Sequence, residues 1–181
     1  MKNTTQMTKH LLILLFAFIL IGCSNESPEE AINNGWSSEI QVNDIISRQK
    51  TDDGRVVLFT AQGTDEGDRF EKVGFALLKR QSNQDWEFIV SNMTAITDDS
   101  HSTRHSVLHY ETDDGNVKKL PIAFGHLKNK NITTVTAEVN GKIKEIEIID
   151  TKSGRYFYQV NAWGPIEFLN SNGEVMDQYG I

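Results

Sequence analysis

Short runs of apolar residues, separated by turns rich in Gly, Asp and Asn, dominate the chain from residue 40 onward. Runs of this length that contain many β-branched and aromatic residues predict β-strands. Four of them, between residues 40 and 96, predict an antiparallel meander. From residue 132 the runs become shorter and regularly spaced, and Asn140-Gly141 predicts a type I′ hairpin turn, because both central residues of that turn need positive φ. The predicted fold class is therefore mainly β.

Two further patterns divide the chain. Ser27-Pro28-Glu29-Glu30 has the form of a capping box with proline at the first helical position, and it predicts a short helix that ends near Gly35. The longest polar stretch, Thr97 to Arg104, predicts an exposed loop. We expect a helix plus antiparallel β module over residues 31–111, followed by a compact β-sandwich-like module over residues 112–181.

The first 22 residues have the pattern of an export signal. Lys2 and Lys9 precede eleven apolar residues, Leu11 through Ile21. A helix that spans a bilayer needs about 20 apolar residues, so this segment predicts a signal peptide over residues 1–22. The alternatives are a secreted protein in which Cys23 has no role, and an uncleaved membrane segment.

The end of this run and the two residues after it, Leu20-Ile21-Gly22-Cys23, resemble the lipobox of bacterial lipoproteins. The resemblance implies cleavage between Gly22 and Cys23, a diacylglycerol on the Cys23 thiol, and often a further acyl chain such as palmitate on the new amino group. Stable anchoring needs more than one chain, since a single acyl chain binds a bilayer only marginally. Residues 23–30 would then be a lipidated, flexible tether.

The remaining layout resembles small, uncharacterised surface lipoproteins of Gram-positive bacteria. The residues that carry this likeness are Leu120 to Gly125, the Ile132 to Ile149 hairpin and the segment Leu169 to Val175. The resemblance implies a helix and meander before a β-sandwich-like module, at the extracytoplasmic face of the cell membrane. It implies no particular activity.

Composition limits the possible partners. The chain has 25 acidic against 18 basic residues, a net charge of −7, which argues against nucleic acid as a partner. Cys23 is its only cysteine, so neither a disulfide nor a second cysteine for catalysis is available. The covalent lipid on Cys23 is the only cofactor we expect, and the bilayer is the only partner that the sequence indicates.

Histidines and carboxylates gather around the predicted loop and form a candidate metal site. Imidazole and carboxylate groups bind zinc or copper, and the candidate ligands are His101, Asp98, Asp99 and His105. His105 and His109 would stand ~13 Å apart along an extended strand, at about 3.3 Å per residue, so they cannot share one ion unaided. The alternative is that these histidines, with His126, belong to loop and sheet surfaces.

Other candidate sites have simpler structural explanations. Acidic turns could bind calcium outside the cell or could be ordinary solvated turns: Asp52-Asp53, Asp65 to Asp68 and Asp113-Asp114. Aromatic residues could form a ligand platform or could fill the core: Trp36, Trp86, Trp163, Tyr156 and Tyr158. Ser102, His105 and Asp99 could be drawn as a triad, but closeness in sequence is not the geometry that such catalysis needs.

A weak internal repeat accompanies the acidic turns. Thr51-Asp52-Asp53-Gly54-Arg55-Val56 and Thr112-Asp113-Asp114-Gly115-Asn116-Val117 agree at five of six positions, 61 residues apart. Both segments predict hairpin turns, since Asp-Gly favours such turns by itself, and duplication of a β module is the alternative.

The sequence as a whole predicts a membrane-anchored extracytoplasmic lipoprotein that acts as a non-enzymatic binding or interaction module. The usual hydrolase and phosphate-binding motifs are missing from it. The alternative hypothesis is a metal or small-ligand sensor that uses the segment around His101.

Overall fold

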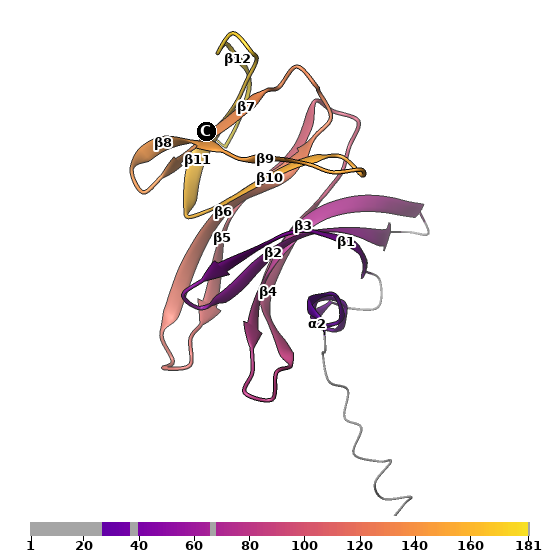
Figure 1. Cartoon of the computed structure of the whole chain (residues 1–181), viewed down its shortest axis with the longest axis vertical. Coiled ribbons are helices and arrows are strands. Elements are labelled where there is room, and N and C mark those ends of the chain that lie inside the picture. Colours follow the sequence, from indigo (N-terminus) through magenta and orange to yellow (C-terminus); the bar gives the residue numbers. More distant parts are fainter. Residues whose placement is uncertain (1–26, 37–39, 66–67, 181) are drawn as a thin grey trace, which may run out of the picture.

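A computed structural model describes residues 27–36, 40–65 and 68–180 of the chain. These residues form one short helix and three antiparallel sheets, each of four strands (Figure 1). The predicted mainly β fold class is confirmed, including its β-sandwich-like character. In the part of the chain that the structure describes, no helix is long and apolar enough to cross a membrane.

The helix α2 (Pro28–Gly35) begins as the sequence predicts. The Ser27 hydroxyl accepts a hydrogen bond from the Glu30 backbone N–H, and the Glu30 carboxylate accepts one from the Ser27 N–H. This capping box satisfies two donors that the first turn of a helix would otherwise leave unpaired. Ala31 and Ile32 are completely buried, so α2 is fixed by its apolar face.

The first sheet, here called the meander sheet, follows the chain order β1-β2-β3-β4. Its strands are β1 (Ile40–Thr51), β2 (Gly54–Asp65), β3 (Asp68–Arg80) and β4 (Trp86–Ala95). The predicted four-strand meander is therefore confirmed.

Two further sheets follow. The middle sheet has the order β5-β6-β10-β9 and consists of β5 (His101–Glu111), β6 (Val117–Leu127), β10 (Arg155–Val160) and β9 (Ile148–Asp150). The outer sheet has the order β12-β11-β7-β8 and consists of β12 (Val175–Tyr179), β11 (Ala162–Leu169), β7 (Thr134–Val139) and β8 (Lys142–Ile146).

The layers stack in the order α2, meander sheet, middle sheet, outer sheet. In β2, Leu58 packs toward the middle sheet while Phe59 packs under α2. In the middle sheet, Phe124 packs toward the meander sheet, whereas Phe157 packs toward the outer sheet. The middle sheet is therefore covered on both faces, which explains why β6 has a continuous apolar run instead of alternating residues.

The contact between the meander and middle sheets combines aromatic packing with polar contacts. The rings of Phe75 and Phe124 meet edge to face with centroids 4.9 Å apart, a geometry worth about 0.5–1.5 kcal/mol beyond simple burial. The hydroxyls of Ser47 and Tyr158 lie 3.1 Å apart across the same contact. These interactions fix the two sheets face to face, so that their hairpins end on the same side of the molecule.

The structure changes two local expectations, for a loop and for Trp163, and places a third, the predicted module division, within the fold. The predicted loop from Thr97 to Arg104 is too long, because β5 already begins at His101 and buries Ser102 and Thr103. The predicted division between residues 111 and 112 falls in the turn of the β5–β6 hairpin, whose strands pair from His101↔Leu127 to Glu111↔Val117. The chain passes from the first sheet to the second between β4 and β5. The division into two modules stays a prediction. Trp163, for which the core is one of the two expected locations, is 43% exposed and does not lie in the core.

Candidate functional site

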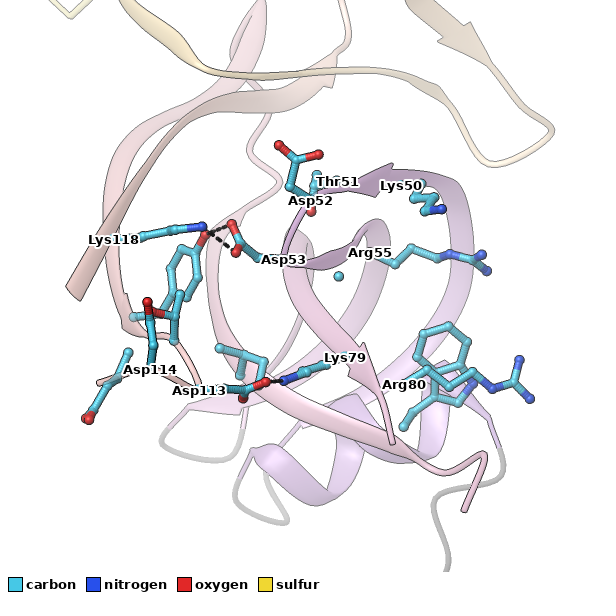
Figure 2. A pocket seen from close by; sticks show the side chains of 16 residues that line it. Lys50, Thr51, Asp52, Asp53, Arg55, Lys79, Arg80, Asp113, Asp114 and Lys118 are labelled. Carbon is cyan, nitrogen blue, oxygen red and sulfur yellow. Dashed lines mark hydrogen bonds and ion pairs between the residues drawn. The ribbon is translucent and has the colours of Figure 1, made fainter. Parts of the chain in front are cut away.

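A cleft of about 590 Å³ opens at one end of the stacked meander and middle sheets (Figure 2). Both copies of the Thr-Asp-Asp-Gly repeat line it. Thr51 to Gly54 forms the β1–β2 turn of the meander sheet, and Thr112 to Gly115 forms the β5–β6 turn of the middle sheet. Segments 61 residues apart in the sequence thus meet in one site.

The two turns have different backbones in spite of their identical sequence. In the first, Thr51 pairs with Gly54 and only Asp52 and Asp53 lie between the strands. Gly54 has φ 150°, and a Cβ there would lie 2.3 Å from the carbonyl oxygen of Leu78, so only glycine fits.

The second turn is longer. Its strands close at the pair Glu111↔Val117, the Gly115 N–H donates to the Thr112 carbonyl at 2.8 Å, and the Thr112 N–H donates to the Asn116 carbonyl at 2.9 Å. Gly115 adopts φ 78°, the left-handed region that closes such turns, and no atom outside the turn crowds it.

One aspartate of each turn is held by the opposite sheet. Asp53 Oδ1 accepts a hydrogen bond from Lys118 Nζ at 2.6 Å, and Asp53 Oδ2 accepts one from the Tyr110 hydroxyl at 2.8 Å. In the other direction, Lys79 of β3 pairs with the Asp113 carboxylate. Figure 2 shows both sets of contacts on the same side of the cleft, where they tie the turns together.

The contacts of Asp53 shift its own pKa and that of Tyr110. The hydrogen bond from Lys118, and then that from Tyr110, holds the pKa of Asp53 below its usual value. Burial, followed by the bond to Asp53, raises the pKa of Tyr110 to about 12. Asp53 is thus ionised and Tyr110 protonated at neutral pH, whereas a general acid or base needs a pKa near the working pH. Neither of these two groups is therefore set up as a general acid or base at neutral pH.

The other side of the cleft is cationic. Lys50, Arg55 and Arg80 line it together with Trp86, and Figure 2 shows the three cationic side chains on the side away from Asp113 and Asp114. The site therefore presents an acidic wall and a basic wall to any ligand that enters it.

The predicted metal ligands each have other partners. His101 stacks on Phe168 with ring centroids 3.9 Å apart and places Nε2 3.2 Å from the Asp177 carboxylate. His105 Nε2 lies 2.9 Å from the carbonyl oxygen of Ala162.

The two carboxylates of that candidate site are also engaged. Asp98 pairs with Lys128, and Asp99 accepts a hydrogen bond from the Thr97 hydroxyl at 2.8 Å. In the described ranges, no three His, Cys, Asp or Glu side chains form a group that could hold a metal ion. The metal site stays a prediction, and no contact of these residues favours it.

The remaining candidates are placed as follows. Ser102 and His105 are three residues apart on β5 and point to opposite faces of the middle sheet, so they do not form a triad with Asp99.

Two of the three acidic turns meet in the cleft, while the side chains of Asp65 to Asp68 lie outside the described residues. Tyr156 and Tyr158 share one face of β10, as the alternation predicts, and pack in the core against the meander sheet. Gly22 and Cys23, the predicted cleavage and lipidation sites, also lie outside the described residues.

Sequence reasoning missed the residues that complete the cleft: Lys50, Arg55, Lys79, Arg80, Tyr110 and Lys118. The Thr-Asp-Asp-Gly repeat was the available signal, because two equal turns at the ends of stacked hairpins can meet. The pattern does not say which sheets stack.

Comparison with known proteins gives no match to a family model, to a curated protein or to a solved structure.

Proposed function

We propose that this protein is a lipid-anchored extracytoplasmic binding protein without catalytic activity, and that its ligand lies in the cleft between the two Thr-Asp-Asp-Gly turns. The observation that carries the proposal is the tying of the two turns across the cleft, by Lys118 and Tyr110 on Asp53 and by Lys79 on Asp113. A cleft whose walls are already fixed before binding loses little conformational entropy when a ligand enters, which favours affinity.

The anchor in this proposal is supported by the sequence. Eleven apolar residues, the last two of which are Leu20 and Ile21, lead directly into Gly22-Cys23, and the lone cysteine of the chain occupies the lipobox position. The chain that follows has enough apolar core to fold outside the cell without disulfides, since three clusters of buried residues hold its four layers together.

The anchor can be tested by mass spectrometry of the native protein. The expected chain begins at a Cys23 that carries acyl chains, and Cys23→Ala should accumulate as an unprocessed precursor. A free thiol at Cys23, or a product cut elsewhere, would show that the anchor is wrong.

The cleft can be tested separately by photo-crosslinking in intact cells. A photoreactive side chain at Asp52, which lines the cleft, should give a discrete adduct. The matched control is Lys152, an exposed position in the turn between β9 and β10 and not part of the cleft lining. Equal labelling from both positions, or no adduct from Asp52, would contradict a ligand in this cleft.

A further inference from the structure

Three cationic side chains line the basic wall of the cleft, and two of them lie over the ring of one tryptophan. Lys50 of β1 lies directly opposite Arg55 of β2, and Arg80 of β3 lies directly opposite Trp86 of β4. The end of the meander sheet therefore carries one cationic side chain on each of β1, β2 and β3, with Trp86 on β4 (Figure 2).

Trp86 acts as a platform for both arginines. The guanidinium carbon of Arg55 lies 5.3 Å from the centroid of the Trp86 ring, and that of Arg80 lies 5.2 Å from it. Trp86 itself is only 7% exposed, so its ring is fixed in the core beneath α2. Stacking on a fixed ring pre-orients each guanidinium, so less side-chain entropy is lost when it binds a ligand.

These cations have no carboxylate partner among the residues that the structure describes. Each ion pair in this part of the chain involves other residues, and the hydrogen bond of Arg80 runs from Nε to the carbonyl of Gln84 at 3.1 Å. Like charges directly opposite in a sheet destabilise it, as Lys50 and Arg55 do here. The chain has seven more negative than positive charges, and Asp52 and Asp53 lie in the turn that Lys50 and Arg55 flank, yet in the described ranges no carboxylate forms an ion pair with the three cations.

We propose that Lys50, Arg55 and Arg80 bind a phosphate group of the ligand, with the rest of the ligand extending along the cleft toward the two acidic turns. This inference rests on the cleft being the ligand site. Guanidinium groups match phosphate oxygens with paired, charge-assisted hydrogen bonds. Three positive charges fit a phosphate, which carries up to about two negative charges, better than a single carboxylate.

The experiment follows backbone amide, arginine Nε–H and Trp86 indole N–H resonances of the full chain in detergent micelles by NMR. Three probes distinguish the sources of phosphate: inorganic phosphate, glycerol 3-phosphate as a monoester, and glycerophosphoglycerol as the diester of a lipid headgroup. We expect saturable shifts at Arg55, Arg80 and Trp86 with at least one probe, weakened when NaCl is raised, because binding is electrostatic. Acetate at the same ionic strength serves as the carboxylate control.

Arg80→Gln should weaken binding of the active probe at least tenfold. The matched control is Arg104→Gln, an exposed arginine of β5 outside the cleft lining, which should leave binding unchanged. Lys50→Gln is a second variant, since Lys50 is exposed and its loss cannot disturb the core; it should weaken binding several-fold.

Absence of saturable shifts with all three probes, equal binding of acetate, or unchanged affinity in both cleft variants would overturn the phosphate site. Adducts at Asp52 in cells together with any of these results would leave the cleft as the ligand site and show that only the ligand class is wrong. Binding of the diester alone would identify a phosphodiester ligand, and binding of the monoester alone a phosphorylated small molecule; either result supports the proposal.

Discussion

The two Thr-Asp-Asp-Gly turns have the same four residues, but they differ in length and in the space around their glycine. The β1–β2 turn is tight, and its glycine packs directly against the backbone of Leu78. The β5–β6 turn is longer and open, and its own side chains stabilise it: Asp114 accepts hydrogen bonds from Thr112 and Asn116. Identical local sequence therefore does not fix the turn, because the strand beside it decides how much room the backbone has.

The comparison also separates the roles of the paired aspartates. Asp53, with a side chain 26% exposed, accepts two hydrogen bonds from the middle sheet, whereas Asp113, 84% exposed, has Lys79 as its ion-pair partner. The first turn is thus held by the fold around it, and the second is held mainly by itself.

Replacing the two glycines should give the largest difference between the turns. Gly54→Ala puts a Cβ against the Leu78 carbonyl at a φ of 150° that L-residues avoid, so we expect a loss of at least about 3 kcal/mol in the free energy of unfolding. The added Cβ of Gly115→Ala has open space around it, so only the left-handed backbone conformation is unfavourable. We expect a loss of about 1–2 kcal/mol in the free energy of unfolding. Urea unfolding of both variants measures the difference, and equal losses would contradict it.

Removing the paired aspartates should give the next largest difference. Asp53→Ala loses two hydrogen bonds and leaves the partly buried Tyr110 hydroxyl without its acceptor, which should cost about 1–2 kcal/mol of stability. Asp113→Ala removes an exposed ion pair and should cause no measurable change. The same unfolding experiment applies, and a larger loss for Asp113→Ala would reverse the assignment of roles.

The parts of this fold that could be predicted from the sequence are those set by neighbouring residues. The capping box at Ser27 and the Asn140-Gly141 turn, with φ values of 54° and 75°, depend on local chemistry alone. The meander was predictable because its turns follow one another along the chain.

The cleft could not be predicted, since its contacts depend on which sheet faces cover each other. Lys79 reaches Asp113 and Lys118 reaches Asp53 only because the meander and middle sheets stack. The prediction of an exposed loop over the first residues of β5 is wrong for a similar reason, since burial also depends on how the strands pack. Polar composition predicts exposure, but Ser102 is buried. Its hydroxyl accepts a hydrogen bond from the Thr97 N–H at 2.8 Å.

The contact of Tyr110 with the first turn should also make stability depend on alkaline pH. Burial and the bond to Asp53 raise the pKa of Tyr110 to about 12 in the folded protein, from 10.0 for an ordinary tyrosine. Between these values the unfolded chain loses a proton that the folded chain keeps, so stability falls as pH rises from about 10 to 12.

Tyr110→Phe should reduce this fall, because it removes the group that titrates. Tyr156 and Tyr158 also have pKa values raised by burial, so part of the alkaline loss remains in the variant. Unfolding measured at several pH values between 9 and 12 gives the difference, and identical profiles for the variant and the natural chain would show that Tyr110 does not contribute.

The smallest expected effect concerns the first threonine of each turn, and here the two turns should differ in sign. Among the described residues the buried Thr51 hydroxyl has no hydrogen-bond partner, while the Thr112 hydroxyl bonds to Asp114 and to the Asn116 carbonyl. Valine replaces the hydroxyl with a methyl group of similar size. Thr51→Val should therefore raise the free energy of unfolding by up to about 1 kcal/mol, because an unpaired buried hydroxyl is costly.

Thr112→Val should lower the free energy of unfolding by about 0.5–1 kcal/mol, because the second turn loses its own hydrogen bonds. Thermal and urea unfolding of the two variants under one set of conditions decide the sign. If both changes were destabilising by equal amounts, the surroundings of the two turns would not differ in the way that their backbones indicate, and the first turn would depend on its own side chains as much as the second.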